Sequence, residues 1–322
     1  MICHALDGLN EGGIGQATIC GNNDTPAISA CLASEGRPEM SLEFYQDRMP
    51  RGPAGCVRDA VRNMSWDTVV VVDGTIVPQL DIDKLLAAHE SGAAVLTIVV
   101  MRDQLHGPGR CEWLTPLGIY VFSRVVLDHI PEQGYQDIKE SLIPKLHAAG
   151  LRVSVFVADA QAPRVTGAET YLGVNGWAIG RMCDPAFSPG DYVRMGEACV
   201  HRSARIDSSA RLLGPVLVGP HCIVEREVTI VGPTSLGSQS RLEEQSVICR
   251  SAIWNNCVVG RAGKVDRCIL VQGTSLAGET TLRNTISVQT PTRSKRKQRA
   301  ADFSQRGPCW PGTLPTGSLP TN

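Results

Sequence analysis

Residues 200–254 read VHRSARIDSSARLLGPVLVGPHCIVEREVTIVGPTSLGSQSRLEEQSVICRSAIW, and every sixth residue of this stretch is apolar. A period of six fits neither the 3.6-residue turn of an α-helix nor the two-residue alternation of a half-buried strand. It suits a coil of three short strands per turn, in which each six-residue unit directs one large side chain inward. The stretch therefore predicts a left-handed parallel β-helix of hexapeptide repeats. The ten positions predicted to point inward are Val200, Ile206, Leu212, Val218, Val224, Ile230, Leu236, Leu242, Ile248 and Trp254.

Small residues and turn residues support the coil. The fourth residue after each inward position is small or β-branched, and Gly-Pro pairs at 214–215, 219–220 and 232–233 indicate bends. We expect Trp254 to be a core residue or a dimer contact. We also expect the repeat to change phase around Gly260–Gly263. After the change, the inward positions are predicted to be Leu270, Leu276, Leu282 and Val288.

The first half of the chain alternates helical patterns with short apolar runs. Uninterrupted apolar runs such as Val69–Val72 and 94–100, placed between helices, indicate a parallel sheet covered on both faces. In the helix that follows the first of these runs, Asp81 is predicted to be the N-cap and Gly92 to end the helix. The predicted class is α/β plus β, divided into an α/β domain at 1–175, a connection at 176–198, the β-helix at 199–290 and a disordered, basic and Pro-rich tail at 291–322.

Composition limits which partners and which cellular location we expect for the protein. The net charge of the 322 residues is −1, which indicates neither a nucleic acid nor a membrane as a partner, although RSKRKQR at 293–299 is basic. None of the twelve cysteines forms a C-x-x-C motif or a zinc-like cluster with histidine. The chain shows no signal peptide and no apolar run long enough to span a membrane. We expect a cytoplasmic protein.

Three segments resemble one family. VVVVDGTIVPQLDIDKLLAAH (69–89), GIYVFSRVVLDHIPEQGYQDIKESLIPKL (118–146) and VTGAETYLGVN (165–175) are similar to segments of the sugar-1-phosphate nucleotidyltransferases, the mannose-1-phosphate guanylyltransferase-like group above all. The resemblance implies a Rossmann-like, doubly wound domain. It also implies that a sugar phosphate attacks the α-phosphorus of a nucleoside triphosphate and releases pyrophosphate, with Mg²⁺ held by carboxylates.

The chain departs from the family at its catalytic elements. ICHALDGLNEGGI resembles the helix after the family's Gly-rich loop, so we expect a truncated domain without the first strand and that loop. Thr75 stands where the family has a metal-binding Asp, Pro116 where it has a sugar-site Asn, and Arg164 where it has a second metal-binding Asp. Residues 101–117 are too short for the family's hairpin with its E-K-P motif. We expect a weakly active or inactive protein, which needs Mg²⁺ only if it is active.

The remaining candidate residues fall into three groups. RGPAG is similar to the family's nucleobase loop, and a simple helix-entry turn explains it equally well. A sugar-site helix start is predicted around residue 137, where N-capping is an equal alternative. The candidates for nucleotide binding are Gly52, Pro53, Ala54 and Gly55, those for sugar binding are Gly118, Asp137 and Lys139, and the candidate for metal binding is Asp73.

Three functions remain open at this point. The first is a family enzyme with little or no activity. The second is a non-catalytic regulatory or assembly subunit that binds a nucleotide, a nucleotide sugar or a partner protein, and that forms a homo- or hetero-oligomer through its β-helix. The third is a β-helix acyltransferase with His201 or His221 as general base. Both histidines are more simply explained as surface or corner residues of the coil.

Overall fold

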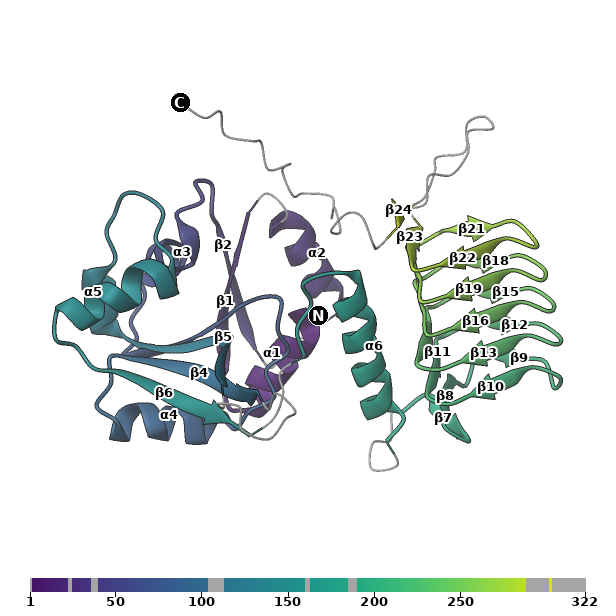
Figure 1. The fold of residues 1–322 in the computed structure, drawn as a ribbon, viewed down its shortest axis with the longest axis horizontal. Helices are drawn as coiled ribbons and strands as arrows, with labels where there is room; N and C mark the ends of the chain where they lie inside the picture. The colour runs from purple at the N-terminus through teal and green to yellow at the C-terminus, as the bar shows by residue number, and fades with distance from the viewer. Residues whose placement is uncertain are drawn as a thin grey trace. The chain divides into compact units, whose positions relative to one another are not determined.

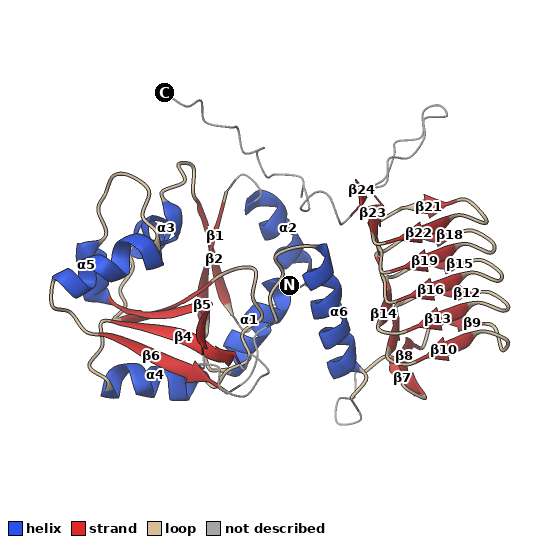
Figure 2. Ribbon diagram, in the orientation of Figure 1, coloured by secondary structure: helices blue, strands red, loops and turns tan. Residues whose placement is uncertain are grey.

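The computed structural model describes residues 2–22, 25–35, 40–103, 113–159, 163–184, 190–287 and 301–302. The chain divides into two compact units, with the boundary between Pro163 and Arg164. The first is an α/β unit and the second carries a β-solenoid, so the predicted class of α/β plus β is confirmed (Figures 1 and 2). The predicted disordered tail at 291–322 lies outside the described residues, apart from 301–302.

The α/β unit follows the predicted order of helices and strands. The carboxylate of Asp81 accepts a hydrogen bond from Lys84 N at 3.0 Å and caps α4, and Gly92 follows that helix, as predicted. The elements are α1 (Ile2–Glu11), β1 (Gln16–Gly21), α2 (Thr25–Glu35), β2 (Ser41–Gln46), α3 (Gly52–Val61), β3 (Thr68–Val72), α4 (Ile82–Ser91), β4 (Leu96–Asp103), β5 (Trp113–Ser123), the 3-10 helix η1 (Arg124–His129), the π-helix η2 (Ile138–Leu142), α5 (Ile143–Ala148) and β6 (Val153–Ala158).

The strands of this unit form two sheets. β1 and β2 pair in parallel, and a separate sheet has the order β3-β5-β4-β6. The prediction of a parallel sheet is wrong for β5, which is antiparallel to both β3 and β4. The short connection explains the difference: only residues 104–112 separate β4 from β5. A parallel crossover needs about a dozen residues or more, usually with a helix.

β3 has one neighbour among the described strands. It pairs with β5 alone, and each of its residues, TVVVV, is only half-buried. The β1–β2 pair and its helices have a small core of their own, formed by Leu6, Ile19, Leu32 and Met40. The α/β unit thus contains two sheets whose backbones are not joined by ladder hydrogen bonds in the described residues.

The second unit begins with a helix and a hairpin strand and continues as the solenoid. Strands of successive coils pair in parallel and form three faces, β8-β11-β14-β17-β20-β23, β9-β12-β15-β18-β21 and β10-β13-β16-β19-β22. The elements are α6 (Ala168–Met182), β7 (Tyr192–Met195), β8 (Ala198–His201), β9 (Arg205–Ile206), β10 (Arg211–Leu213), β11 (Val216–Val218), β12 (Ile223–Val224), β13 (Thr229–Val231), β14 (Thr234–Leu236), β15 (Arg241–Leu242), β16 (Val247–Cys249), β17 (Ala252–Ile253), β18 (Val258–Val259), β19 (Lys264–Asp266), β20 (Ile269–Leu270), β21 (Ser275–Leu276), β22 (Thr281–Arg283), β23 (Thr285–Ser287) and β24 (Ala301–Asp302).

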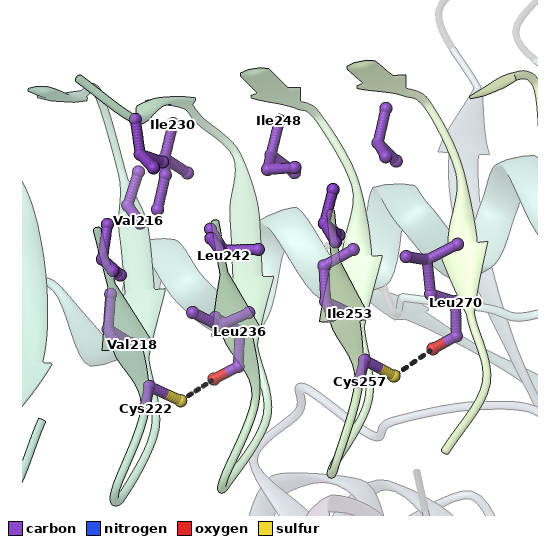
Figure 3. Close-up of a cluster of buried hydrophobic side chains, with 14 of the residues drawn as sticks. Val216, Val218, Cys222, Ile230, Leu236, Leu242, Ile248, Ile253, Cys257 and Leu270 are labelled. Atoms are coloured by element: carbon purple, nitrogen blue, oxygen red, sulfur yellow. Dashed lines mark hydrogen bonds between the residues drawn. The ribbon is translucent and has the colours of Figure 1, made fainter. Parts of the chain in front are cut away.

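The inward ladder agrees with nine of the ten predicted positions, Val200 to Ile248, all of which lie in or against one core cluster. Figure 3 shows part of this cluster, with the thiols of Cys222 and Cys257 at corners beside the carbonyl oxygens of Leu236 and Leu270. Small side chains at the corners let the backbone of each coil turn closely around the core.

The prediction for the tenth position, Trp254, is wrong. Leu236 pairs with Ile253, which is 1% exposed and takes the inward place, whereas Trp254 lies outside the core cluster. The phase changes between Ile248 and Ile253, not at the predicted Gly260–Gly263. Ser251 explains the shortened corner: it is fully buried, its hydroxyl donates to Cys249 O at 2.6 Å, and Cys268 N donates to that hydroxyl at 3.0 Å.

The later part of the ladder repeats this shortening. Val265 and Leu270 are successive inward residues only five positions apart, as the pairings of β19 and β20 show. The predicted inward positions Leu270 and Leu276 are buried, and Leu282 is partly buried against the same core. Val288 lies outside the described residues.

The boundary between the units differs from the predicted one at 175. α6 belongs to the second unit because Ile179 and Cys183 pack against Cys199, Tyr192 and Leu217 of the solenoid side. Residues 176–198 are therefore not a plain connection: they complete α6 and form β7, which pairs antiparallel with β8. Among the described residues, no helix has both the length and the apolar character needed to cross a bilayer.

Candidate functional site

The RGPAG loop at the start of α3 is held against the chain around Gln136. Gly52 has a φ of +78°, and a Cβ atom there would lie 2.5 Å from Gln136 O, so only glycine fits. Ala54 N donates to Gln136 O at 3.0 Å, and Gln136 N donates to Arg51 O at 2.6 Å. The loop is thus fixed by backbone contacts with a segment more than eighty residues later in the chain.

Two arginines strengthen this attachment. Arg51 Nη1 donates to Glu132 O at 2.8 Å, and the Arg58 guanidinium donates to Ile130 O at 3.2 Å and also to Pro131 O. Arg58 is 6% exposed, and its charge is compensated by Asp59 at 2.5 Å. A buried guanidinium is costly unless it is paired and hydrogen-bonded, so this arrangement holds α3 and residues 130–136 in one geometry.

This attachment places the predicted nucleotide loop next to the predicted start of the sugar-site helix. Gln136, which contacts Gly52 and Ala54, directly precedes Asp137. Asp137 Oδ1 accepts hydrogen bonds from Lys139 N at 2.6 Å and Glu140 N at 2.9 Å. Asp137 is therefore the N-cap of η2, the alternative that the sequence left open, and its sugar-binding role stays a prediction.

The predicted nucleotide loop has limited donor capacity of its own. Ala54 is fully buried and its N–H already donates to Gln136, and Pro53 carries no N–H. Gly55 approaches Arg51 so closely that a Cβ atom would lie 2.7 Å from Arg51 Cβ. The helix-entry alternative thus accounts for much of this loop, and nucleotide binding by Gly52–Gly55 stays a prediction.

Asp73, Thr75 and Gly118 form a second cluster at the end of β3. Asp73 Oδ1 accepts from Thr75 N at 3.0 Å and from Thr75 Oγ1 at 2.8 Å, which closes the turn after the strand. Asp73 N donates to Gly118 O at 2.9 Å. Gly118 has a φ of +78°, and a Cβ atom there would lie 3.1 Å from Asp73 Cβ. The carboxylate has a local structural role as a turn residue.

The other altered positions come from other parts of the sequence, and Pro163, the residue before Arg164, accepts a hydrogen bond from Val77 N at 2.9 Å. Pro116 is in β5 opposite Val100, where the β4–β5 register is irregular. Arg164 is exposed and opens the second unit. Within the described ranges, no group of three or more His, Cys, Asp and Glu side chains is placed to hold a metal ion. Asp73 thus belongs to no such group among the described residues, and metal binding by Asp73 stays a prediction.

The two histidines of the solenoid both contact Ser203. His201 Nδ1 lies 2.8 Å from Ser203 Oγ, and its ring packs edge-on against Tyr192 with centroids 5.0 Å apart. His221 N donates to the same hydroxyl at 2.9 Å, and the His221 residue is exposed. These contacts agree with the interpretation of both as corner residues of the coil.

Trp254 and Arg58 show what the sequence patterns missed. Trp254 Nε1 donates to Tyr171 Oη at 3.0 Å, so this residue attaches α6 to the solenoid.

A hollow beside α3 is lined by residues that no sequence motif indicated. They are Arg58, Arg62, Arg124, Val125, Leu127, Asp128 and Glu132.

Known proteins share sequence with the chain over most of its length, although no family model matches it. "Mannose-1-phosphate guanylyltransferase" of Mycobacterium tuberculosis is 24% identical over 242 residues, which cover 68% of this chain and 66% of the relative. "Probable mannose-1-phosphate guanylyltransferase 1" of Oryza sativa is 25% identical over 303 residues, with coverages of 84% and 82%. "UTP--glucose-1-phosphate uridylyltransferase" of Synechocystis is 26% identical over 217 residues, with coverages of 60% and 54%.

The matched region thus spans just under two thirds of the mycobacterial relative and about half of the Synechocystis relative. Among solved structures, HddC from Yersinia pseudotuberculosis aligns with a TM-score of 0.46 and 15% identity, covering 52% of this chain and 81% of that one.

Proposed function

Because its curated homologues are sugar-1-phosphate nucleotidyltransferases, we propose that this chain is a member of that family in nucleotide-sugar biosynthesis with little or no activity of its own. In the family reaction the phosphate oxygen of a sugar 1-phosphate attacks the α-phosphorus of a nucleoside triphosphate, and pyrophosphate leaves. The enzyme contributes position and charge neutralisation rather than covalent chemistry. The altered residues of this chain affect the second of these, charge neutralisation.

The hydrogen bond from Thr75 Oγ1 to Asp73 Oδ1, at 2.8 Å, carries the proposal. The resemblance implies a metal-binding carboxylate at position 75, and threonine supplies an uncharged hydroxyl there. That hydroxyl also donates a hydrogen bond to an oxygen of the neighbouring Asp73 carboxylate. Arg164, where the resemblance implies a second carboxylate, adds a positive charge that opposes cation binding. The residues present therefore do not fit a two-carboxylate Mg²⁺ site.

Ligand binding does not need the lost carboxylates. Gly52 and Gly118 keep the positive φ angles that let the backbone approach a neighbour closely, and Lys139 adds an exposed cation near the capped start of η2. We propose that Gly52–Gly55 contacts the nucleotide and that Gly118, Asp137 and Lys139 contact the sugar phosphate. Binding without turnover would leave a protein that responds to a nucleotide or nucleotide sugar.

A pyrophosphate-release assay tests the proposal. The full chain is supplied with Mg²⁺, with mannose 1-phosphate or glucose 1-phosphate, and with GTP, UTP or dTTP, beside the mycobacterial relative as the reference. We expect turnover at least about 10³-fold below the reference, the scale on which loss of one preorganised charge-stabilising group acts. Calorimetry with the same nucleotides measures binding separately. Turnover equal to that of the reference enzyme would overturn the proposal that this chain has little or no activity.

A matched pair of variants examines position 75 directly. Thr75→Asp restores the carboxylate that the resemblance implies, whereas Thr75→Ser keeps the hydroxyl and is the control. We expect Thr75→Asp to strengthen Mg²⁺-dependent nucleotide binding and Thr75→Ser to leave it unchanged. Equal binding by both variants would show that position 75 is not the cause of weak metal binding.

A non-catalytic assembly subunit is the second candidate, and the solenoid supplies its observation. Val193, Met195 and Leu213 are 36%, 52% and 51% exposed. They lie on β7, the edge strand beside β8, and on β10, the edge strand of its own face, at the end of the solenoid where the coils begin (Figure 1). We propose that this end pairs with a second copy of the chain or with an active relative. Sedimentation of the wild type beside a Met195→Glu, Leu213→Glu double variant tests this proposal. The proposal would be overturned if the wild type stayed monomeric both alone and when mixed with an active relative.

An acyltransferase function is the more distant alternative. It requires His201 or His221 to act on a bound acyl donor, although both contact Ser203 at a coil corner. Acetyl-coenzyme A binding that disappears in His201→Ala or His221→Ala would favour it over both other candidates. A cytoplasmic location stays a prediction alongside these functions.

A further inference from the structure

The hollow beside α3 has charged walls and the size of a small-molecule site. Its volume is about 470 Å³, within the roughly 300–1,000 Å³ that is usual for such sites. One wall is the C-terminal part of α3 and its C-cap, which contribute Arg58 and Arg62 one helical turn apart. The other wall is η1 and the residues after it, which contribute Arg124, Asp128 and Glu132.

Arg58 already uses its charge and its donors within the protein. Its guanidinium donates to Ile130 O and Pro131 O and pairs with the carboxylate of Asp59. Asp59 also pairs with Arg51, with Nη1 and Oδ2 3.3 Å apart. Arg58 therefore holds the two walls of the hollow together, and a ligand has to be bound by the other charged residues.

The guanidinium of Arg124 is fixed in place with one edge left free. Its Nη1 donates to Met64 O at 2.8 Å and to Trp66 O at 3.3 Å, and its Cζ lies 5.5 Å from the centroid of the Trp66 ring. Trp66 is itself held, because its Nε1 donates to Val61 O at 3.0 Å. Within the described residues, Nε and Nη2 of Arg124 form no hydrogen bond. These two donors can bind two oxygens of one phosphate, at a low cost in side-chain ordering.

Arg62, Asp128 and Glu132 carry charges that the described part of the chain leaves unpaired. All three residues are exposed, and their side chains form no hydrogen bond or ion pair there. The backbone of Glu132 is held in place, since its carbonyl oxygen accepts from Arg51 Nη1 at 2.8 Å. With Arg124, two positive and two negative groups thus line the same hollow without neutralising one another.

This combination favours a ligand with one phosphate group and several hydroxyl groups. Arginine binds phosphate through paired, charge-assisted hydrogen bonds, and two guanidinium groups match its two negative charges. Carboxylates accept hydrogen bonds from hydroxyl groups and repel a second anionic group. Val125, which is 40% exposed, adds an apolar surface in the hollow for the C–H groups of a sugar ring.

We propose that this hollow binds a hexose monophosphate, with the phosphate on Arg62 and Arg124 and the sugar hydroxyl groups on Asp128 and Glu132. The site shares no residue with the sugar-phosphate contacts proposed above, and the inference does not depend on that function. The bound ligand would connect α3 with η1 and so strengthen the attachment that also fixes the Gly52 loop.

Calorimetry of the full chain with glucose 6-phosphate tests the proposal, in the absence of nucleotide and Mg²⁺. Inorganic phosphate is titrated in parallel. We expect glucose 6-phosphate to bind at least about tenfold more tightly than phosphate, because the carboxylates add hydrogen bonds to the hydroxyl groups. Equal affinities would mean an adventitious ion only and would overturn the proposal. The same conclusion would follow if glucose 6-phosphate did not bind at concentrations up to about 10 mM.

Charge-removing variants locate the ligand. Arg62→Gln and Arg124→Gln should each weaken glucose 6-phosphate binding at least about tenfold. Arg62 has no described side-chain partner, so Arg62→Gln keeps the test valid even if Arg124→Gln disturbs folding. Arg152→Gln, at another exposed arginine of the same unit, is the matched control and should bind like the wild type. Wild-type affinity in Arg62→Gln would overturn the proposal.

Two further variants separate this site from the proposed substrate site. Asp128→Asn should weaken the binding of glucose 6-phosphate but not that of inorganic phosphate, because the carboxylate contacts only the sugar. Lys139→Gln should leave glucose 6-phosphate binding unchanged. If Lys139→Gln abolished binding while Arg62→Gln kept it, the ligand would occupy the proposed substrate site, and the inference about the hollow would be wrong.

Discussion

The indole Nε1–H of Trp254 donates a hydrogen bond to the hydroxyl of Tyr171 at 3.0 Å, and the two ring centroids lie 6.3 Å apart. Tyr171 is on α6, and Trp254 directly follows β17. Burial raises the pKa of the Tyr171 hydroxyl, so it stays neutral at physiological pH. With the bond from Ser235 Oγ to Asn175 Oδ1 at 2.9 Å, this contact attaches α6 to the outer side of the solenoid.

Tyr171→Phe should therefore lower the free energy of unfolding by about 1 kcal/mol, because the Trp254 N–H loses its acceptor in a half-buried site while the ring contact remains. Urea unfolding followed by tryptophan fluorescence measures the change. Tyr135→Phe is the control, since Tyr135 is 66% exposed. Equal unfolding midpoints for the two variants would show that the Tyr171 hydroxyl contributes nothing.

Truncation at the shortened corner tests the phase of the ladder. Ile253 is 1% exposed, so Ile253→Ala should cost about 2–5 kcal/mol of unfolding free energy. Leu213→Ala, at a position 51% exposed on β10, should cost less than about 1 kcal/mol. Circular dichroism during urea unfolding provides the comparison. A small effect of Ile253→Ala would contradict the inward placement of this residue.

Three glycines separate backbone strain from steric contact. At Gly52 a Cβ atom meets both a positive φ and Gln136 O at 2.5 Å, whereas at Gly13 the φ is +79° with nothing within 4 Å. Gly52→Ala should therefore destabilise the protein more than Gly13→Ala, which should cost about 1–2 kcal/mol. Gly173→Ala, in open space within α6, should stabilise it by about 0.4–1 kcal/mol. Thermal unfolding of all three ranks them, and equal costs at Gly52 and Gly13 would rule out the steric contribution.

Buried His89 predicts a pH dependence. Its Nδ1 lies 2.8 Å from Thr97 Oγ1 and its Nε2 lies 2.9 Å from Ser123 Oγ. Burial lowers the pKa of His89 below its usual 6.5. The unfolded chain then binds more protons than the folded one below that pH, so the free energy of unfolding falls as the pH drops below about 6.5.

His89→Gln removes the titration and keeps an amide donor and acceptor. We expect it to flatten the stability profile between about pH 5 and 6.5, as measured by urea unfolding at a series of pH values. His221→Gln, at an exposed turn, is the control and should keep the wild-type slope. A wild-type slope in the His89 variant would assign the dependence to other groups.

Much of the fold could be predicted because its signals are local and periodic. A six-residue apolar period places nine successive inward residues, and capping chemistry places the ends of α4 at Asp81 and Gly92. The same local reasoning left Asp137 between two roles. The structure shows that its carboxylate caps η2, because the nearest donors are the backbone N–H groups two and three residues later.

The sequence by itself determined the period of the solenoid and the order of helices and strands, because these depend on neighbouring residues along the chain. Only the tertiary structure decided the shortened corner, since Ile253 and Trp254 are both apolar and the difference lies in the buried hydroxyl of Ser251 and in the contact with Tyr171. It also decided the direction of β5 and the attachment of the Gly52 loop to Gln136. These features depend on pairings between residues far apart in the sequence, which no local pattern records.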